Sequence, residues 1–133
     1  MKSVLLDTHA WVWSLTADSH LSAKAVEVME QADVVYVSVV SLFEIGQKVR
    51  VGKWPQMQPF LDRLIGIADQ QGARFVEVSP RISLLAATLE WEHRDPFDRI
   101  IGATAITRGC VLVSVDPAFD MLVGRPEWLG RLW

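Results

Sequence analysis

The segment Ser3-Val4-Leu5-Leu6-Asp7-Thr8-His9-Ala10 decides the fold class, because its pattern changes from strand to helix within a few residues. The first four residues form a short apolar run, which predicts a buried strand over residues 3–6. Asp7 ends this run, too early for the apolar part of a signal peptide. Residues 8–15 then show a helical pattern. The segment therefore predicts a buried strand followed at once by a helix.

The same alternation of short apolar runs and helical stretches continues along the chain. Further strands are predicted over residues 34–37, 75–78 and 110–114, and residues 128–133 form either a fifth strand or a tail. Helices are predicted over residues 8–15, 22–31, 41–51, 59–71, 82–91 and 99–108. Such alternation predicts an α/β fold whose central, mostly parallel sheet of four to five strands has helices on both faces. With 133 residues, we expect one domain spanning residues 1–133.

Composition narrows the class of protein but leaves its partner open. The chain has 13 basic and 16 acidic residues and a net charge of −3, which argues against a general nucleic-acid coat protein. An enzyme whose acids gather at a metal site is still compatible with this charge. A single cysteine, Cys110, excludes an internal disulfide and fits a reducing compartment, so we expect a cytoplasmic protein. No apolar run approaches the roughly 18 residues of a membrane span, and we expect no membrane association.

Four acidic residues occur where a parallel sheet places its ligands, at the carboxyl ends of strands. Asp7 directly follows the first predicted strand, and Asp116 follows the fourth by two residues. Glu44 lies early in the helix after the second strand, and Asp98 lies at the start of the helix before the fourth. Converging carboxylates need a cation to remain ionised together. Oxygen-only ligands favour Mg²⁺ or Mn²⁺, and a pair of such ions is typical of phosphodiester hydrolysis.

Each acid also has a local structural interpretation. The alternatives are a helix cap for Asp7, a capping box of Ser41 with Glu44, an N-cap role for either Asp95 or Asp98, and a turn opened by Asp116. Only the joint pattern of the four acids favours chemistry.

Four segments carry a resemblance to a known family. They are Leu5-Leu6-Asp7-Thr8-His9-Ala10, Ser41-Leu42-Phe43-Glu44-Ile45, His93-Arg94-Asp95-Pro96-Phe97-Asp98-Arg99-Ile100-Ile101 and Val113-Ser114-Val115-Asp116. In this order, over about residues 3–120, they resemble PIN-domain ribonucleases, specifically VapC-type toxins of toxin–antitoxin pairs. The Asp-Pro-Phe-Asp-Arg block is the most specific. The fourth segment is the least specific, since relatives often carry a Thr-Arg pair where this chain has Ser114-Val115.

The resemblance implies a PIN-like domain that acts as a magnesium-dependent endoribonuclease, a hydrolase that cuts RNA and leaves a 5′-phosphate. It implies a catalytic quartet of Asp7, Glu44, Asp98 and Asp116. Asp7, Asp98 and Asp116 are then expected to hold Mg²⁺, with Mn²⁺ as a possible substitute, and Glu44 to orient water or a second ion. It also implies a cognate antitoxin as partner and a homodimer.

Further side chains near the predicted site are candidates for contact with RNA or protein. Thr8 and Arg99 flank the acids and are expected to bind a substrate phosphate. The alternatives are that Thr8 only starts a helix and that Arg99 lies on a solvated helix face. Trp11 and Trp13 are two residues apart, so a helix directs them differently. We expect one in the core and the other at a subunit or antitoxin contact, on a face that also includes Trp54.

Two other functions compete with the ribonuclease. A catalytically inactive PIN-like module would bind RNA or a protein without cleaving it, although such a module would be free to lose its acids. A phosphotransfer enzyme would use Asp7 as acceptor. One class of such enzymes needs a second Asp two residues after the first, where this chain has His9. A receiver domain needs a Lys late in the chain, and the last lysine here is Lys53. We rank the phosphotransfer enzyme last.

Overall fold

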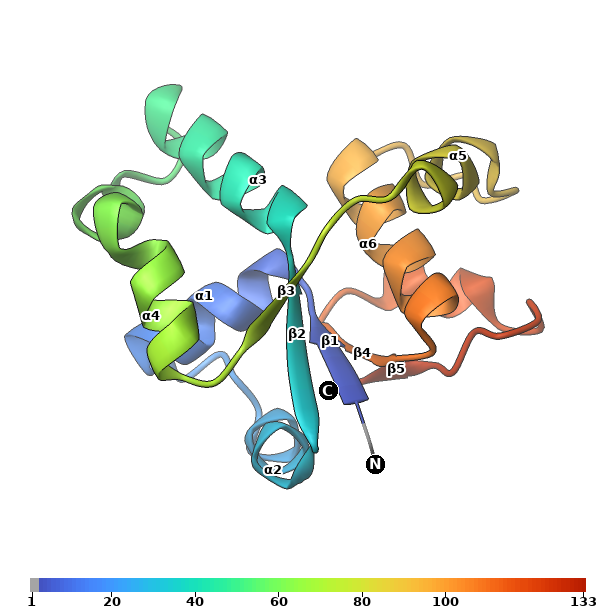
Figure 1. Ribbon diagram of the computed structural model, residues 1–133, viewed down its shortest axis with the longest axis horizontal. Coiled ribbons are helices and arrows are strands. Elements are labelled where there is room, and N and C mark those ends of the chain that lie inside the picture. Colours follow the sequence, from blue (N-terminus) through green and yellow to red (C-terminus); the bar gives the residue numbers. More distant parts are fainter. Residues whose placement is uncertain (1–2) are drawn as a thin grey trace.

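The computed structural model describes residues 3–133, which form one layer of strands between two layers of helices (Figure 1). In chain order the elements are β1 (Ser3–Leu6), α1 (Thr8–Thr16), α2 (Ala23–Gln31), β2 (Val34–Ser38), α3 (Val39–Arg50), the 3₁₀ helix η1 (Pro55–Arg63), α4 (Leu64–Gln70), β3 (Arg74–Val76), α5 (Pro80–Thr88), α6 (Pro96–Arg108), β4 (Val111–Val113), the 3₁₀ helix η2 (Pro117–Leu122) and β5 (Arg131–Leu132).

The sheet has five strands in the order β3-β2-β1-β4-β5, and each pairing between them is parallel. This confirms the α/β prediction and shows that the C-terminal stretch contributes a fifth strand. β1 lies at the centre, and its apolar residues Val4, Leu5 and Leu6 are almost completely buried. A strand covered on both faces has no polar side, which is why its sequence reads as a continuous apolar run.

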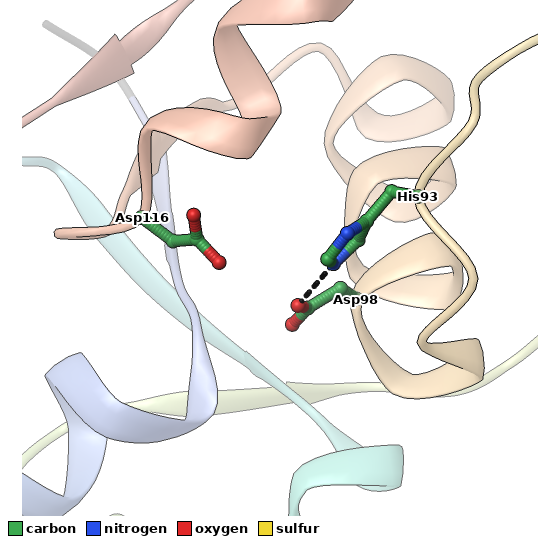
Figure 2. Close-up of side chains that lie close together, drawn as sticks. All are labelled: His93, Asp98 and Asp116. Atoms are coloured by element: carbon green, nitrogen blue, oxygen red, sulfur yellow. Dashed lines mark hydrogen bonds and ion pairs between the residues drawn. The ribbon is translucent and has the colours of Figure 1, made fainter.

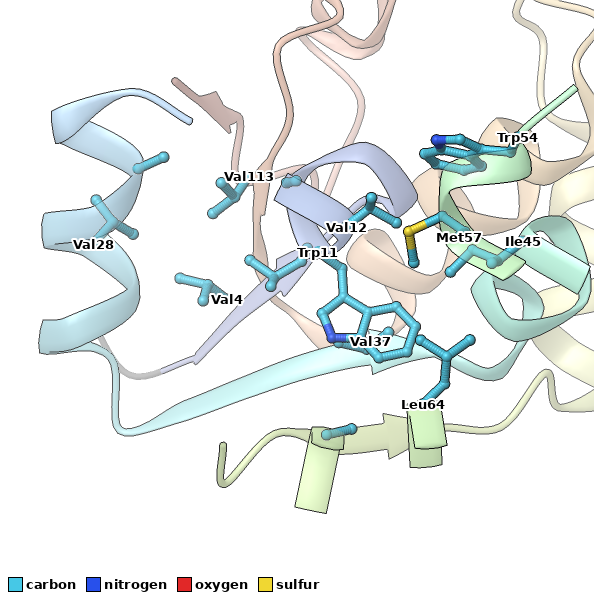
Figure 3. Close-up of a cluster of buried hydrophobic side chains, with 14 residues drawn as sticks. Val4, Trp11, Val12, Val28, Val37, Ile45, Trp54, Met57, Leu64 and Val113 are labelled. Carbon is cyan, nitrogen blue, oxygen red and sulfur yellow. The ribbon is translucent and has the colours of Figure 1, made fainter. Parts of the chain in front are cut away.

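Alternate side chains of the strands enter two cores, one on each face of the sheet. Val4 and Leu6 pack with the buried Trp11 and Met57 beneath α1, α2, α3 and α4 (Figure 3). Leu5 points to the other face, where the second core lies beneath α5 and α6. Both cores therefore share the strands of a single sheet.

Several helix boundaries differ from the sequence-based prediction because a capping side chain lies earlier than expected. Ser38 Oγ accepts a hydrogen bond from Val40 N at 3.1 Å, so α3 begins at Val39 rather than at residue 41. The stretch predicted as one helix over residues 59–71 is divided into η1 and α4. Pro59 lies inside η1, and because proline has no N–H it cannot donate to a regular α-helical ladder.

Two of the three tryptophans expected near a protein contact, Trp11 and Trp54, are buried within the domain. Trp11 is fully buried and Trp54 nearly so, whereas Trp13 is half-buried. Trp11 therefore lies in the core while Trp13 keeps some exposed surface, but the expectation that Trp54 belongs to an exposed contact face is wrong, because its indole ring is covered by the chain itself. Within residues 3–133, the helices are all too short or too polar to cross a membrane.

Candidate active site

The carboxyl ends of the two central strands bring Asp7 beside Ser114. Leu6 pairs with Val113 across β1 and β4, and Asp7 N donates to Val113 O at 3.1 Å. The Ser114 hydroxyl donates to Asp7 Oδ2 at 2.5 Å and accepts from Asp116 N at 3.0 Å. Ser114 thus connects the acid after β1 to the acid after β4.

A cleft of about 490 Å³ opens at this edge of the sheet. The structure brings all four predicted acids to its wall, together with Thr8 from the predicted substrate contacts. The lining residues are Asp7, Thr8, His9, Trp13, Glu44, Lys48, His93, Asp95, Asp98, Val115, Asp116 and Pro117. Residues separated by more than 100 positions in the chain therefore share one cleft.

Asp7 combines the two roles that its sequence position left open. Its Oδ1 accepts from Ala10 N at 2.9 Å and so caps α1, while the residue also lines the cleft. Burial raises the pKa of Asp7 to about 6, although the Ser114 hydroxyl and the Ala10 N–H partly offset this, and the charges of Glu44 and Asp116 raise it further. In this environment, the ionised carboxylate gains from a nearby cation.

Glu44 lies inside α3 rather than in its first turn, which rules out the alternative interpretation of Glu44 as part of a capping box with Ser41. Ser38 caps the helix, and the Ser41 hydroxyl instead forms a 2.8 Å hydrogen bond with the Thr8 hydroxyl. Lys48 Nζ binds Glu44 Oε2 at 2.6 Å. Glu44 Oε1 is buried and has no hydrogen-bond partner among the described residues.

Asp95 and Asp98 have distinct environments at the start of α6. Asp95 Oδ1 accepts from Phe97 N at 2.9 Å and from Asp98 N at 3.5 Å, so Asp95 is the N-cap. Of the two acids that the sequence offered as N-cap, Asp95 takes this role and Asp98 does not. Asp98 Oδ2 instead lies 2.7 Å from His93 Nε2. Burial raises the pKa of Asp98 to about 6, although the hydrogen bond with His93 partly offsets this, and the charges of Asp95 and Asp7 raise it further.

His93 is a residue of the cleft that the sequence analysis did not single out. Its side chain points toward those of Asp98 and Asp116 (Figure 2), and one ligand atom from each of the three lies within 4.8 Å of the others. Asp116 approaches from the start of η2, where its Oδ1 accepts from Ala118 N at 2.9 Å. The available signal was a histidine five residues before Asp98, with a proline between them to turn the chain.

Arg99 does not face the cleft, which corrects the expectation that it binds a substrate phosphate. Its Nε donates to Ala86 O at 2.9 Å, Nη2 to Leu89 O at 2.6 Å, and Nη1 to Trp91 O and His93 O at 2.7 and 2.9 Å. The guanidinium is therefore occupied by backbone carbonyls. It holds the irregular segment of residues 89–95 that carries His93.

Comparisons with known proteins identify the family of this chain. The family model of the PIN domain matches residues 4–123. The chain belongs to the PIN-domain family. Ribonuclease VapC22 of Mycobacterium tuberculosis is 33% identical to this PIN domain over 117 residues, covering 87% of the chain and 88% of that relative.

Solved structures share the fold of this PIN domain. A chain of VapBC2 from Rickettsia felis, bound to a promoter DNA fragment, superposes with a TM-score of 0.68 at 16% identity and covers 98% of both chains. A chain of the toxin–antitoxin system VapBC-5 from Mycobacterium tuberculosis superposes with a TM-score of 0.68 at 19% identity, covering 99% of this chain and 100% of that one.

The donor set of the PIN-domain cleft fits a divalent cation. The unpartnered Glu44 Oε1 is a buried anionic oxygen, and leaving such an atom unpaired is costly. Asp7, Asp98 and Asp116 add further carboxylate oxygens to the same cleft. Lys48 neutralises only one side of this group, through Glu44 Oε2. A bound cation would compensate the remaining negative charge.

The metal-free PIN domain is expected to lose stability as the pH rises from about 4 to about 6. The folded state binds the Asp7 proton more tightly than the unfolded state does, since the pKa is about 6 against 3.8. The contribution of Asp7 is therefore favourable only at low pH and declines through this window by about 3 kcal/mol. Urea unfolding in EDTA at a series of pH values measures it.

Asp7→Asn supplies the control for this pH dependence, because its amide can still cap α1 but does not titrate. Subtracting the pH profile of this variant from that of the wild type removes the contributions of the other carboxylates. The prediction is contradicted if the difference between the two profiles is flat between about pH 4 and 6, or if it changes in the opposite direction.

Proposed function

We propose that this chain is a metal-dependent endoribonuclease, the toxin of a toxin–antitoxin pair, formed by one PIN domain over residues 1–133. The observation that carries the proposal is the buried, unpartnered Glu44 Oε1 in a cleft shared with three other carboxylates. An inactive binding module has no need for a buried carboxylate oxygen without a hydrogen-bond partner, which is costly to maintain. The 33% identity to Ribonuclease VapC22 supports RNA as the substrate.

Asp7, Asp98 and Asp116 would hold Mg²⁺, with Mn²⁺ as a substitute, and Glu44 would orient water or a second ion. Carboxylate oxygens are the ligands that these hard ions prefer. When bound, divalent ions would supply Lewis-acid activation of water and stabilise the leaving 3′ oxygen of the RNA.

Neighbouring side chains position these acids. Ser114 orients Asp7 by donating to Oδ2, while Ala10 N holds Oδ1. Lys48 binds one oxygen of Glu44, whose other oxygen is buried and has no hydrogen-bond partner among the described residues. Thr8, whose hydroxyl is linked to Ser41, lies on the wall where a substrate phosphate would enter. We assign Thr8 the substrate contact.

A cognate antitoxin and a second copy of the chain are the proposed protein partners, and the cytoplasm the proposed location. Phe43, one residue before Glu44, is 64% exposed and lies 6.0 Å from Phe97, measured between ring centroids. Exposed aromatic side chains of this kind favour burial in a protein interface. An antitoxin Arg or Lys would form charge-assisted hydrogen bonds with the carboxylates and block the cleft.

Metal dependence tests the proposed function directly. Millimolar Mg²⁺ or Mn²⁺ is expected to raise the melting temperature of the metal-free protein, because an ion that binds only the folded state stabilises it. EDTA is expected to abolish RNA cleavage, and added Mg²⁺ or Mn²⁺ to restore it. The measurements are a thermal melt and a cleavage assay on the same preparation. Cleavage that continues in EDTA, or a melting temperature that does not respond to either ion, contradicts the proposal.

A further inference from the structure

One end of the cleft contains a nitrogen donor as well as carboxylates. His93 Nε2 lies 2.7 Å from Asp98 Oδ2, and Asp116 completes a group whose ligand atoms are within 4.8 Å of one another (Figure 2). The three side chains come from two segments, since His93 and Asp98 lie at the entry to α6 and Asp116 lies before η2. A group with this spacing could hold one metal ion.

Glu44 supplies an independent indication that a cation binds in this cleft. Its side chain is 5% exposed, its Oε1 has no hydrogen-bond partner in the described part of the chain, and it lines the same cleft as His93. Lys48 pairs with the other oxygen only. Positive charge from a bound ion would satisfy an atom that residues 3–133 leave unpaired.

The imidazole of His93 is held in place by its surroundings. Its ring lies 5.0 Å from the ring of Trp91 and 6.5 Å from that of Phe119, measured between centroids. The backbone carbonyl oxygen of His93 accepts a hydrogen bond from Arg99 Nη1 at 2.9 Å. These contacts fix both the backbone and the ring, so little freedom is lost when the ring nitrogen coordinates an ion. Such prior ordering is typical of a built metal site.

We infer that His93 is a metal ligand, together with Asp98 and Asp116, and that this end of the cleft prefers divalent transition metals to Mg²⁺. The inference rests on the proposed metal-dependent function. Mg²⁺ binds oxygen ligands and retains several waters, whereas an imidazole nitrogen is a ligand of transition metals. The carboxylates of the cleft offer oxygen alone, so Mg²⁺ binding should depend less on His93 than Mn²⁺ binding does.

Metal binding by His93→Gln tests the preference. The glutamine amide can still hydrogen-bond to Asp98 but lacks the imidazole nitrogen. We expect the affinity for Mn²⁺, titrated into metal-free protein by calorimetry, to fall at least about tenfold, and that for Mg²⁺ to change less than about threefold. The matched control is His9→Gln, because His9 lines the same cleft but packs on Trp13 and Trp54 outside the cluster. His9→Gln should leave Mn²⁺ affinity unchanged.

Pulsed EPR on the wild-type protein tests for a nitrogen ligand even if His93→Gln does not fold. In protein labelled with ¹⁵N-histidine and loaded with Mn²⁺, pulsed EPR should detect a directly coordinated nitrogen, and the signal should persist in His9→Gln and vanish in His93→Gln. Mn²⁺ that binds without nitrogen coupling overturns the role of His93 and leaves the metal-dependent function standing. Equal losses of Mn²⁺ and Mg²⁺ affinity in His93→Gln overturn the preference. Failure of both ions to bind the wild-type protein overturns the proposed function as well.

Discussion

Replacing Asp98 with Asn is expected to lower RNA cleavage at least about 100-fold while leaving the fold intact. Asn is nearly the same size, but it cannot carry the negative charge that a cation requires. The N-terminus of α6 is capped by Asp95, so the helix does not depend on the Asp98 carboxylate. Because burial already disfavours the charged form of Asp98, loss of the charge should not destabilise the metal-free protein. Cleavage rates and circular dichroism measure the two effects.

Asp95→Asn is the matched control for Asp98→Asn. Asp7→Asn shows how much cleavage activity is lost when a carboxylate of the site is removed. Asn caps helices about as well as Asp, so Asp95→Asn should change the unfolding free energy by no more than about 0.5 kcal/mol. We expect it to retain most of the activity. The assignment of Asp98 as the third acid is wrong if Asp95→Asn loses as much activity as Asp7→Asn while Asp98→Asn still cleaves RNA.

Replacing Arg99 with Ala is expected to lower the free energy of unfolding by about 3 kcal/mol or more, since hydrogen bonds from a charged donor contribute about 1.5–3 kcal/mol each and do not add fully. The variant leaves the carbonyls of Ala86, Leu89, Trp91 and His93 without their shared donor. Residues 89–95 would then loosen, and His93 would lose its fixed position near Asp98. Urea unfolding measures the loss of stability, and Mn²⁺ affinity reports on His93.

Two further substitutions separate this structural role from a phosphate contact. Arg99→Lys keeps the charge but not the planar fork of donors, so it should restore little of the lost stability. Arg94→Ala removes a nearby exposed arginine and should change the unfolding free energy by no more than about 0.5 kcal/mol. If Arg99→Ala instead unfolds like the wild type and loses only cleavage, the structural role is wrong.

Local pattern was sufficient to predict the sheet and the edge at which the four acids gather. β1 was predictable because a strand buried on both faces needs a continuous apolar run, and Asp7 was predictable as a site residue because it follows that strand directly. The structure brings Asp98 and Asp116 to the same cleft because they lie at the starts of neighbouring elements, and it brings Glu44 there from the interior of α3. The extra strand β5 could not be distinguished from a tail, because its two residues carry too short a pattern.

The sequence by itself determined the alternation of strands and helices, the parallel sheet and the gathering of four acids at one edge, since all of these follow from periodicity and from order along the chain. Only the tertiary structure decided which side chains meet. His93 and Arg99 act through residues 89–95, which have no regular structure and hence no periodicity from which to predict a direction. Asp95 and Asp98 both suit a helix start in sequence, and only their contacts in space distinguish them, since Asp95 accepts from Phe97 N whereas Asp98 pairs with His93.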